Sequence, residues 1–169
     1  LSTRTTHPYF IEMIQTIFDN VGFKMKFTNP YQFKTKGQMV SECKDKNILA
    51  DIVDSTVSCS HWKRKHQQCG YCVPCMIRRA SLLRGGVKES ITYHQASYAN
   101  LLNFVKNKQD GRDDIFSVIM AIENAKKSNL KAWVLKSGKL KEQDIGKYEN
   151  VFIEGLQEVE AFLKKEKLV

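Results

Sequence analysis

Four of the five cysteines lie close together in the stretch CSHWKRKHQQCGYCVPC. Cys59, Cys69, Cys72 and Cys75 have the spacing C-x9-C-x2-C-x2-C. Two residues between thiols allow both sulfurs to reach one ion across a tight turn, and Gly70 helps the backbone to fold over. Four thiolates suit a tetrahedral zinc ion and leave no ligand position for a reactive water. The spacing therefore predicts a structural Zn²⁺ site with these four cysteines as its ligands.

Other uses of these thiols stay open. An iron–sulfur cluster also takes four cysteines, although the familiar iron–sulfur spacings differ from this one. A redox-active C-x-x-C pair requires only two of the four. His61 and His66 could each replace a sulfur, but a histidine in such a loop is more often solvated. Cys43 falls on the expected core face of a helix, where a free cysteine behaves as a small buried apolar residue.

The chain is basic, with 27 lysines and arginines against 18 acidic residues and a formal net charge of +9. Such a balance favours a polyanionic partner, whether nucleic acid, a nucleotide or phosphate, although a lysine-rich solvated surface explains it equally well. Four thiolates around one zinc ion carry a charge of −2, which nearby cations are expected to offset. These cations are Lys63, Arg64, Lys65, Arg78 and Arg79.

Length and composition indicate one domain with a single core, or a core with an appendage. The chain has 169 residues, of which 42% are hydrophobic. It contains neither a run of about eighteen apolar residues nor a secretory signal pattern, so we expect a cytoplasmic protein that does not enter a membrane. Because it begins with Leu1 rather than methionine, we also expect it to be part of a longer protein.

Hydrophobic periodicity predicts a mostly helical chain. The expected helices cover residues 6–20, 35–53, 75–86, the second half of 89–109, 111–129 and 148–167. Between the first two, Phe23, Met25 and Phe27 alternate with Lys24 and Lys26, which is the period of a half-buried strand. A lone strand cannot satisfy its own backbone hydrogen bonds, so this one requires a sheet.

The stretch STVSCSHW…CGYCVPCMIRRASLLRGG, preceded by NPYQFKTKGQM, resembles the C-terminal half of the 7-cyano-7-deazaguanine synthase (QueC) family. Within that family it is most similar to the QatC proteins of a bacterial anti-phage system. The resemblance covers residues 2–86. It implies the C-terminal part of a Rossmann-like α/β (PP-loop ATPase) fold over residues 1–88, with residues 89–169 as a helical accessory region packed on it. The four cysteines then correspond to the family's zinc ligands.

The resemblance also implies an activity. QueC-like enzymes, which act in queuosine biosynthesis, are ATP-dependent ligases that adenylate a carboxylate on a deazapurine and convert it to a nitrile. Their ATP-binding loop has the pattern SGGxDS, which this sequence lacks. We therefore expect the chain to be inactive alone and to use ATP only in a full-length protein. Arg4, Thr6, Thr35 and Lys36 match positions near the family's substrate, although capping and solvation explain them equally well.

A second hypothesis requires no chemistry. The chain could be a zinc module that binds nucleic acid or a protein partner through its basic surface. Under the first hypothesis, the lone strand would be the last strand of a parallel sheet formed by an earlier part of the protein. Its apolar edge would then be covered by that part, by another chain or by a second copy in a homo-oligomer.

Overall fold

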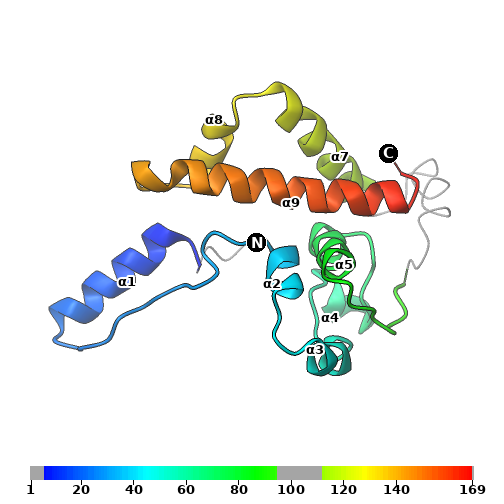
Figure 1. The fold of residues 1–169 in the computed structure, drawn as a ribbon, viewed down its shortest axis with the longest axis horizontal. Helices are drawn as coiled ribbons and strands as arrows, with labels where there is room; N and C mark the ends of the chain where they lie inside the picture. The colour runs from blue at the N-terminus through cyan, green and yellow to red at the C-terminus, as the bar shows by residue number, and fades with distance from the viewer. Residues whose placement is uncertain (1–5, 95–111, 169) are drawn as a thin grey trace. The chain divides into compact units, whose positions relative to one another are not determined.

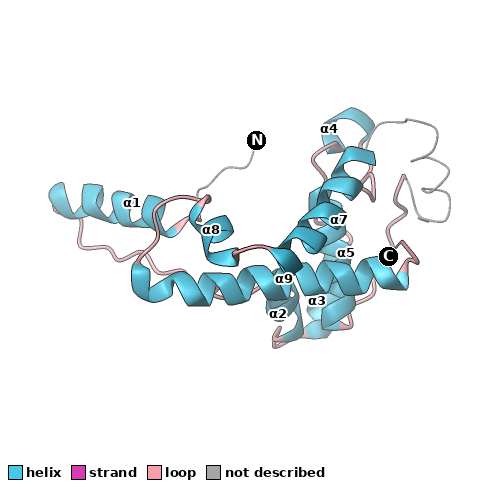
Figure 2. Cartoon of the chain, turned by 90° about the horizontal axis from the view of Figure 1, so that it is seen from above, coloured by secondary structure: helices cyan, strands magenta, loops and turns pink. Residues whose placement is uncertain are grey.

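The computed structural model describes residues 6–94 and 112–168, and this part of the chain is helical (Figure 1). Along the chain the helices are α1 (Pro8–Asn20), α2 (Lys36–Ser41), α3 (Lys46–Val53), α4 (Trp62–Lys65), α5 (Val73–Gly85), α7 (Arg112–Lys127), α8 (Leu130–Leu135) and α9 (Ile145–Lys165), with a 3₁₀ turn, η1 (Glu142–Asp144), before the last. Figure 2 shows helices and loops but no strand in the described ranges. The predicted predominance of helix is confirmed.

The predicted strand at residues 23–27 is wrong, because this segment has no strand partner among the described residues. It runs back along α1 instead (Figure 1), where Phe18 contacts the rings of Phe23 and Phe27. A strand is defined by its ladder with a neighbour. Residues 23–27 do alternate between apolar and charged side chains, but this alternation does not provide the second strand that a ladder requires.

Residues 35–53 form two helices rather than one. Thr35 begins α2 with a capping box: its hydroxyl accepts from the Gln38 N–H at 3.0 Å, and the Gln38 side chain accepts from the Thr35 N–H at 2.7 Å. Asp45 begins α3, where one carboxylate oxygen accepts from the N–H groups of Asn47 and Ile48 at 3.0 Å each. The aspartate cap thus interrupts the predicted helix.

The described residues pack as two compact units. Unit 1 consists of residues 1–34 and 129–152, and unit 2 of residues 35–128 and 153–169. Helices α1 and α8 belong to unit 1, whereas α2, α3, α4, α5 and α7 belong to unit 2. The expected division of the chain at residue 88 follows the resemblance and stays a prediction.

The main core lies in unit 2 and contains the four clustered cysteines. Met76 and Ala80 from α5 pack there with apolar side chains of α7 and α9. The buried members from those two helices are Ile115, Ile122, Val159, Phe162 and Leu163. Together with the partly buried Val118, Ile119 and Leu156 they recur at three- to four-residue spacing, so apolar stripes of both predicted helices face the core. The helix predicted in the second half of 89–109 lies outside the described residues.

Helices α2 and α5 approach closely at a glycine. A Cβ built on Gly85 would lie 2.1 Å from Val40 Cγ1 and 2.9 Å from Val40 Cβ. We expect Gly85→Ala to lower the free energy of unfolding by about 2–3 kcal/mol, because overpacking forces neighbouring atoms to move. Urea denaturation measures this change.

The control for this prediction is Gly155→Ala, since a Cβ on Gly155 in α9 meets no atom within 4 Å. This variant should be neutral or stabilised by up to about 1 kcal/mol. Adding Val40→Ala to Gly85→Ala should recover part of the loss. If Gly85→Ala is as stable as Gly155→Ala, the close helix contact is wrong.

Candidate metal centre

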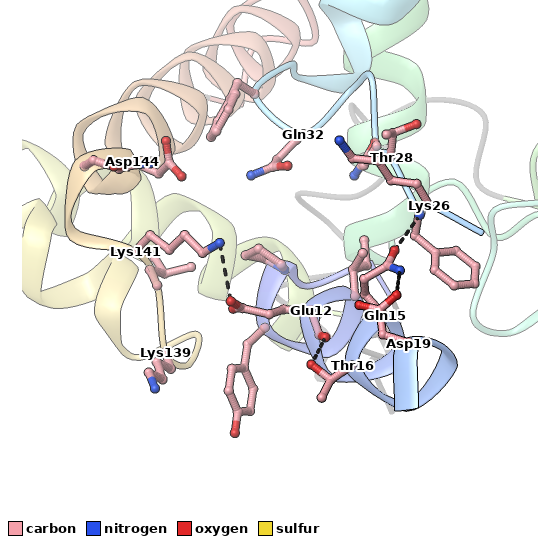
Figure 3. Close-up of a pocket in the computed structure, with 18 of the residues that line it drawn as sticks. Glu12, Gln15, Thr16, Asp19, Lys26, Thr28, Gln32, Lys139, Lys141 and Asp144 are labelled. Atoms are coloured by element: carbon pink, nitrogen blue, oxygen red, sulfur yellow. Dashed lines mark hydrogen bonds and ion pairs between the residues drawn. The ribbon is translucent and has the colours of Figure 1, made fainter. Parts of the chain in front are cut away.

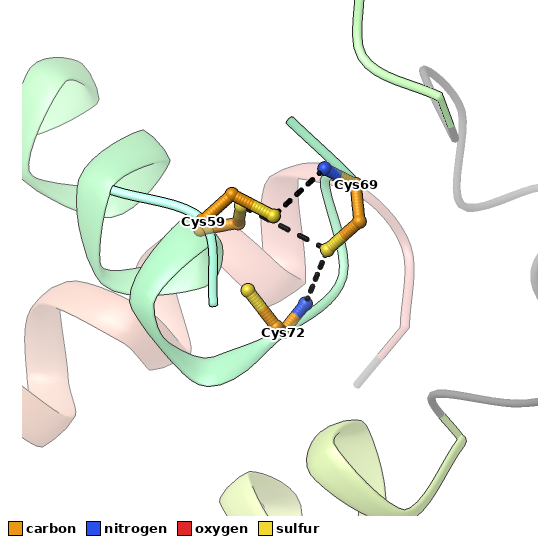
Figure 4. Close-up of side chains that lie close together, drawn as sticks. Cys59, Cys69 and Cys72 are labelled. Atoms are coloured by element: carbon orange, nitrogen blue, oxygen red, sulfur yellow. Dashed lines mark hydrogen bonds between the residues drawn. The ribbon is translucent and has the colours of Figure 1, made fainter. Parts of the chain in front are cut away.

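The sulfurs of Cys59, Cys69, Cys72 and Cys75 all lie within 4.8 Å of one another. The Cys69 and Cys75 sulfurs are 3.9 Å apart. Four sulfurs at about 2.3 Å from a tetrahedral zinc ion would be about 3.8 Å apart. Figure 4 shows the Cys59, Cys69 and Cys72 side chains pointing toward one another. Among the described residues, this is the one group of three or more potential ligands that could hold a metal ion.

Local backbone structure brings the thiols together. Cys72 is the N-cap of α5 and Cys75 lies in its first turn, where Pro74 fits because the first helical residues need no N–H partner. The positive end of the helix dipole therefore lies at two of the thiols, where it favours negative charge. Gly70 has φ +86°, a left-handed conformation that lets the chain turn between Cys69 and Cys72.

Backbone N–H groups point at the sulfurs. The Cys59 sulfur accepts from the His61 N–H at 3.3 Å and from the Cys69 N–H at 3.2 Å. The Cys69 sulfur accepts from the Cys72 N–H at 3.3 Å. Such donors stabilise thiolates, which are the forms that bind metal. They also orient the ligands around a common centre.

The neighbouring thiols shift one another's pKa values. Hydrogen bonds with the Cys69 and Cys75 thiols lower the pKa of Cys72 far below the usual thiol range. The bond to Cys72 raises the pKa of Cys69 to about 12, and bonds to Cys69 and Cys72 raise the pKa of Cys75. Four neighbouring thiols cannot all ionise without a cation, so a metal ion that binds here must displace protons.

The centre is closed to solvent. Cys72 and Cys75 are 0% exposed and Cys69 is 1% exposed, and all four cysteines belong to the main core cluster. A buried ion with four sulfur ligands has no open position for substrate or water. The donor set, spacing and burial therefore fit a structural ion, and they fit zinc well because thiolates are soft ligands.

A buried glutamine joins the two parts of the cysteine loop. The Gln68 side chain is 3% exposed; its oxygen accepts from the Ser58 N–H at 3.2 Å and its nitrogen donates to the Thr56 carbonyl at 3.3 Å. These bonds hold the chain before Cys59 beside the chain before Cys69. Sequence reasoning missed Gln68, because a glutamine in a polar loop carries no distinctive signal.

Two of the cations expected to offset the thiolate charge have other partners. Arg78 is buried and donates to Glu89 at 2.8 Å, to the Val53 carbonyl at 2.6 Å and to the Thr56 hydroxyl at 2.6 Å. Arg79 lies over the rings of Tyr93 and Phe162, 5.0 and 4.8 Å from their centroids. Both positive charges therefore have partners outside the quartet, and the expectation that they offset the thiolate charge stays a prediction.

The remaining candidate ligands lie outside the quartet. The His61 ring packs 5.9 Å from the Tyr71 ring, and His66 is exposed with φ 50° at the end of α4. Cys43 is half-buried rather than fully buried, and its thiol donates to the Asp45 carbonyl at 3.3 Å. None of the three belongs to the group of potential ligands found in the described residues.

The expected substrate contacts are spread over both units. Arg4 lies outside the described residues, and Thr6 is exposed before α1 in unit 1. In unit 2 the Thr35 hydroxyl is bonded to the Glu158 carboxylate, and Lys36 is exposed. The structure thus shows a capping role for Thr35, and whether any of these residues meets a substrate stays a prediction.

Glu158, which the sequence reasoning did not single out, joins α2 and α5 to α9. Its side chain is 5% exposed, and it accepts from Thr35, from the Gly37 N–H at 3.1 Å and from Arg84 at 2.7 Å. Three donors compensate the burial of this carboxylate. The contact also explains Gly37, where a Cβ would lie 2.5 Å from the Glu158 carboxyl carbon.

The structure therefore defines a helical protein with a candidate four-cysteine metal centre. Residues 6–85 match the model of a family described as "Queuosine biosynthesis protein QueC". No curated protein matches the chain, and no solved structure does. The matched region contains α1 to α5 and all four cysteines, so it supports a QueC-like family for this part of the chain.

No helix in the described ranges combines the length and the apolar character needed to cross a membrane.

Proposed function

We propose that the matched region is the zinc-bearing C-terminal part of a QueC-like ATP-dependent ligase or nitrile synthase. Its substrate would be a deazapurine or another purine-like base, and it would work in the cytoplasm. Residues 1–88 would form this region and residues 89–169 a helical accessory region, within a Rossmann-like protein closest to the QatC group. The ATP-binding part, with its SGGxDS loop, would be supplied from outside the 169 residues.

One observation carries the proposal: four sulfurs within 4.8 Å of one another lie inside the region that matches the QueC family. Zinc would hold the loop of residues 59–72 against the N-terminus of α5. It would supply structural stability rather than chemistry, because four thiolates fill its coordination shell. Substrate contacts would come from elsewhere, with Lys36 and Thr6 as exposed candidates.

The test joins the chain to the ATP-binding half of a QueC enzyme and measures AMP and nitrile formation from ATP, ammonia and 7-carboxy-7-deazaguanine. The joined protein should release AMP and form the nitrile, whereas the chain alone should do neither. Lys36→Ala in the joined protein should raise KM for the base, and Lys44→Ala, at another exposed lysine, should leave it unchanged. A joined protein that folds and binds zinc but forms no AMP contradicts the proposal.

The alternative is a zinc module without catalysis that binds nucleic acid. The surface of α4 supports this alternative. Lys63 and Arg64 are exposed there beside the partly buried Trp62. A nucleic-acid site of this kind should bind single-stranded RNA or duplex DNA with affinity that falls steeply with salt. Fluorescence anisotropy with Lys63→Glu and Arg64→Glu separates the two functions, because these changes should abolish nucleic-acid binding and leave AMP formation intact.

A further inference from the structure

Cys59 is the ligand of the quartet that local chain geometry does not place. Cys69, Cys72 and Cys75 follow one another at three-residue intervals, so one turn and the start of α5 bring their sulfurs together. Cys59 comes ten residues before Cys69, and the short helix α4 lies between them. Closing a loop of this length costs conformational entropy. A further contact is therefore needed to hold Cys59 at the quartet.

The segment that leads into Cys59 is bonded by a side chain rather than by a second strand. Residues 56–59 are in neither helix nor turn. The Gln68 amide oxygen accepts from the Ser58 N–H at 3.2 Å, and the amide nitrogen donates to the Thr56 carbonyl at 3.3 Å. A carboxamide suits this pair of bonds, because it carries an acceptor and a donor on the same carbon.

Gln68 is itself fixed in place beside a ligand. Its side chain is buried, and its backbone carbonyl accepts from the His94 N–H at 2.9 Å. The next residue, Cys69, donates its N–H to the Cys59 sulfur at 3.2 Å (Figure 4). The two amide bonds and this N–H···S bond together join residues 56–59 to residues 68–69. The position of the Cys59 sulfur therefore depends on the Gln68 amide.

Arg78 holds the same segment at an earlier point. It donates to the Thr56 carbonyl at 3.2 Å and to the Thr56 hydroxyl at 2.6 Å. Thr56 is three residues away from Cys59, whereas Gln68 also bonds Ser58, which directly precedes Cys59. Arg78 thus attaches the start of the segment to α5, and Gln68 directs its end to the quartet.

We propose that Gln68 is a positioning residue that makes Cys59 the fourth ligand of the metal centre. Without its amide, Cys69, Cys72 and Cys75 would hold the ion and a water molecule would take the fourth position. Structural zinc sites are closed by four protein ligands, whereas catalytic ones keep an open position for water. Gln68 therefore keeps the centre closed. This inference rests on the proposed zinc site, and its test separates the two.

The test replaces Gln68 by methionine in the full chain, which keeps the side-chain length but removes both hydrogen-bonding groups. X-ray absorption should show three sulfur ligands and one oxygen ligand. Competition with a chelator should show zinc affinity about 10–100-fold lower, the range found when partners of metal ligands are lost. Cys59→Ser provides the reference spectrum of a three-sulfur shell.

Gln67→Met is the matched control, because Gln67 is the neighbouring glutamine and its side chain donates to the Thr92 carbonyl at 2.9 Å instead. It should keep four sulfurs and the zinc affinity of the unmodified chain. If Gln68→Met does not fold, Gln68→Asn gives the same test, because its amide is one methylene too short to reach both partners. It too should show three sulfurs.

A double-mutant cycle separates positioning from a general effect on the fold. If Gln68 acts through Cys59, adding Gln68→Met to Cys59→Ser should lower the zinc affinity by less than about twofold, because the ligand that it positions is already gone. If the two losses multiply, Gln68 supports the loop in general and the proposal is overturned.

The sulfur count gives a second decisive outcome. Four sulfurs in both Gln68→Met and Gln68→Asn would overturn the positioning role and leave the metal centre intact. An unmodified chain that folds without metal would overturn the metal centre itself, and the role of Gln68 with it.

Discussion

Replacing Cys72 by serine is expected to release the zinc ion and to unfold residues 56–86. The Cys72 sulfur belongs to the quartet, and Cys72 begins α5. Structural zinc contributes about 10–16 kcal/mol of apparent binding free energy in small peptides, whereas whole domains are stable by about 5–15 kcal/mol. The loop around the ion therefore cannot keep its structure without it. Atomic absorption should fall from one zinc per chain to about none, and the thermal unfolding midpoint should fall with it.

Cys43→Ser is the matched control, because Cys43 is the fifth cysteine and lies outside the quartet. It should keep the zinc content of the unmodified chain and nearly its stability. Loss of zinc from Cys43→Ser would mean that the ligand set is wrong. A Cys72→Ser chain with an unchanged melting curve would show that the metal has no structural role.

Replacing Arg78 by methionine is expected to lower the free energy of unfolding by about 3–5 kcal/mol. The Arg78 side chain is 6% exposed and pairs with Glu89, whose side chain is 13% exposed. Methionine would remove the guanidinium that donates to that carboxylate and to the Val53 and Thr56 carbonyls. Among the described residues, only the hydroxyl of Tyr93 would still donate to Glu89. The loop that leads to Cys59 would then lose its attachment to α5. Urea denaturation at saturating zinc isolates this effect from metal loss.

Two variants control the Arg78 prediction. Arg64→Met removes an exposed arginine from the same loop and should change stability by less than about 0.5 kcal/mol. Arg78→Lys should recover only part of the loss, because one ammonium group cannot reach three separate acceptors as the guanidinium fork does. If Arg78→Met is no less stable than Arg64→Met, the buried network does not hold the loop.

The helices and the clustering of the four cysteines are predictable from the sequence because both depend on local spacing. Pro8 at the start of α1, the apolar stripe of α7 and the glycine after α5 are signals within a few residues of the elements they define. The four-cysteine spacing likewise describes one turn and one helix start. The short helices α4 and α8 were not predicted, because segments of four to six residues are too short to show a helical period.

The errors came from contacts between distant residues. The roles of Arg78 and Glu158 depend on partners far away in the sequence, so their charges carry no local signal. For the segment at 23–27 the alternation is a local signal, but a strand forms only where a second chain segment lies beside it. The Gln15 side chain bonds one edge of this segment instead (Figure 3), and no sequence pattern predicts this contact.

X-ray absorption spectroscopy on the purified chain is the most direct test of the metal centre. A structural site of four thiolates should show one zinc per chain, surrounded by four sulfur atoms at about 2.3 Å and by no nitrogen or oxygen ligand. A shell with fewer sulfurs, a short metal–metal distance typical of an iron–sulfur cluster, or a folded chain that contains no metal would contradict it.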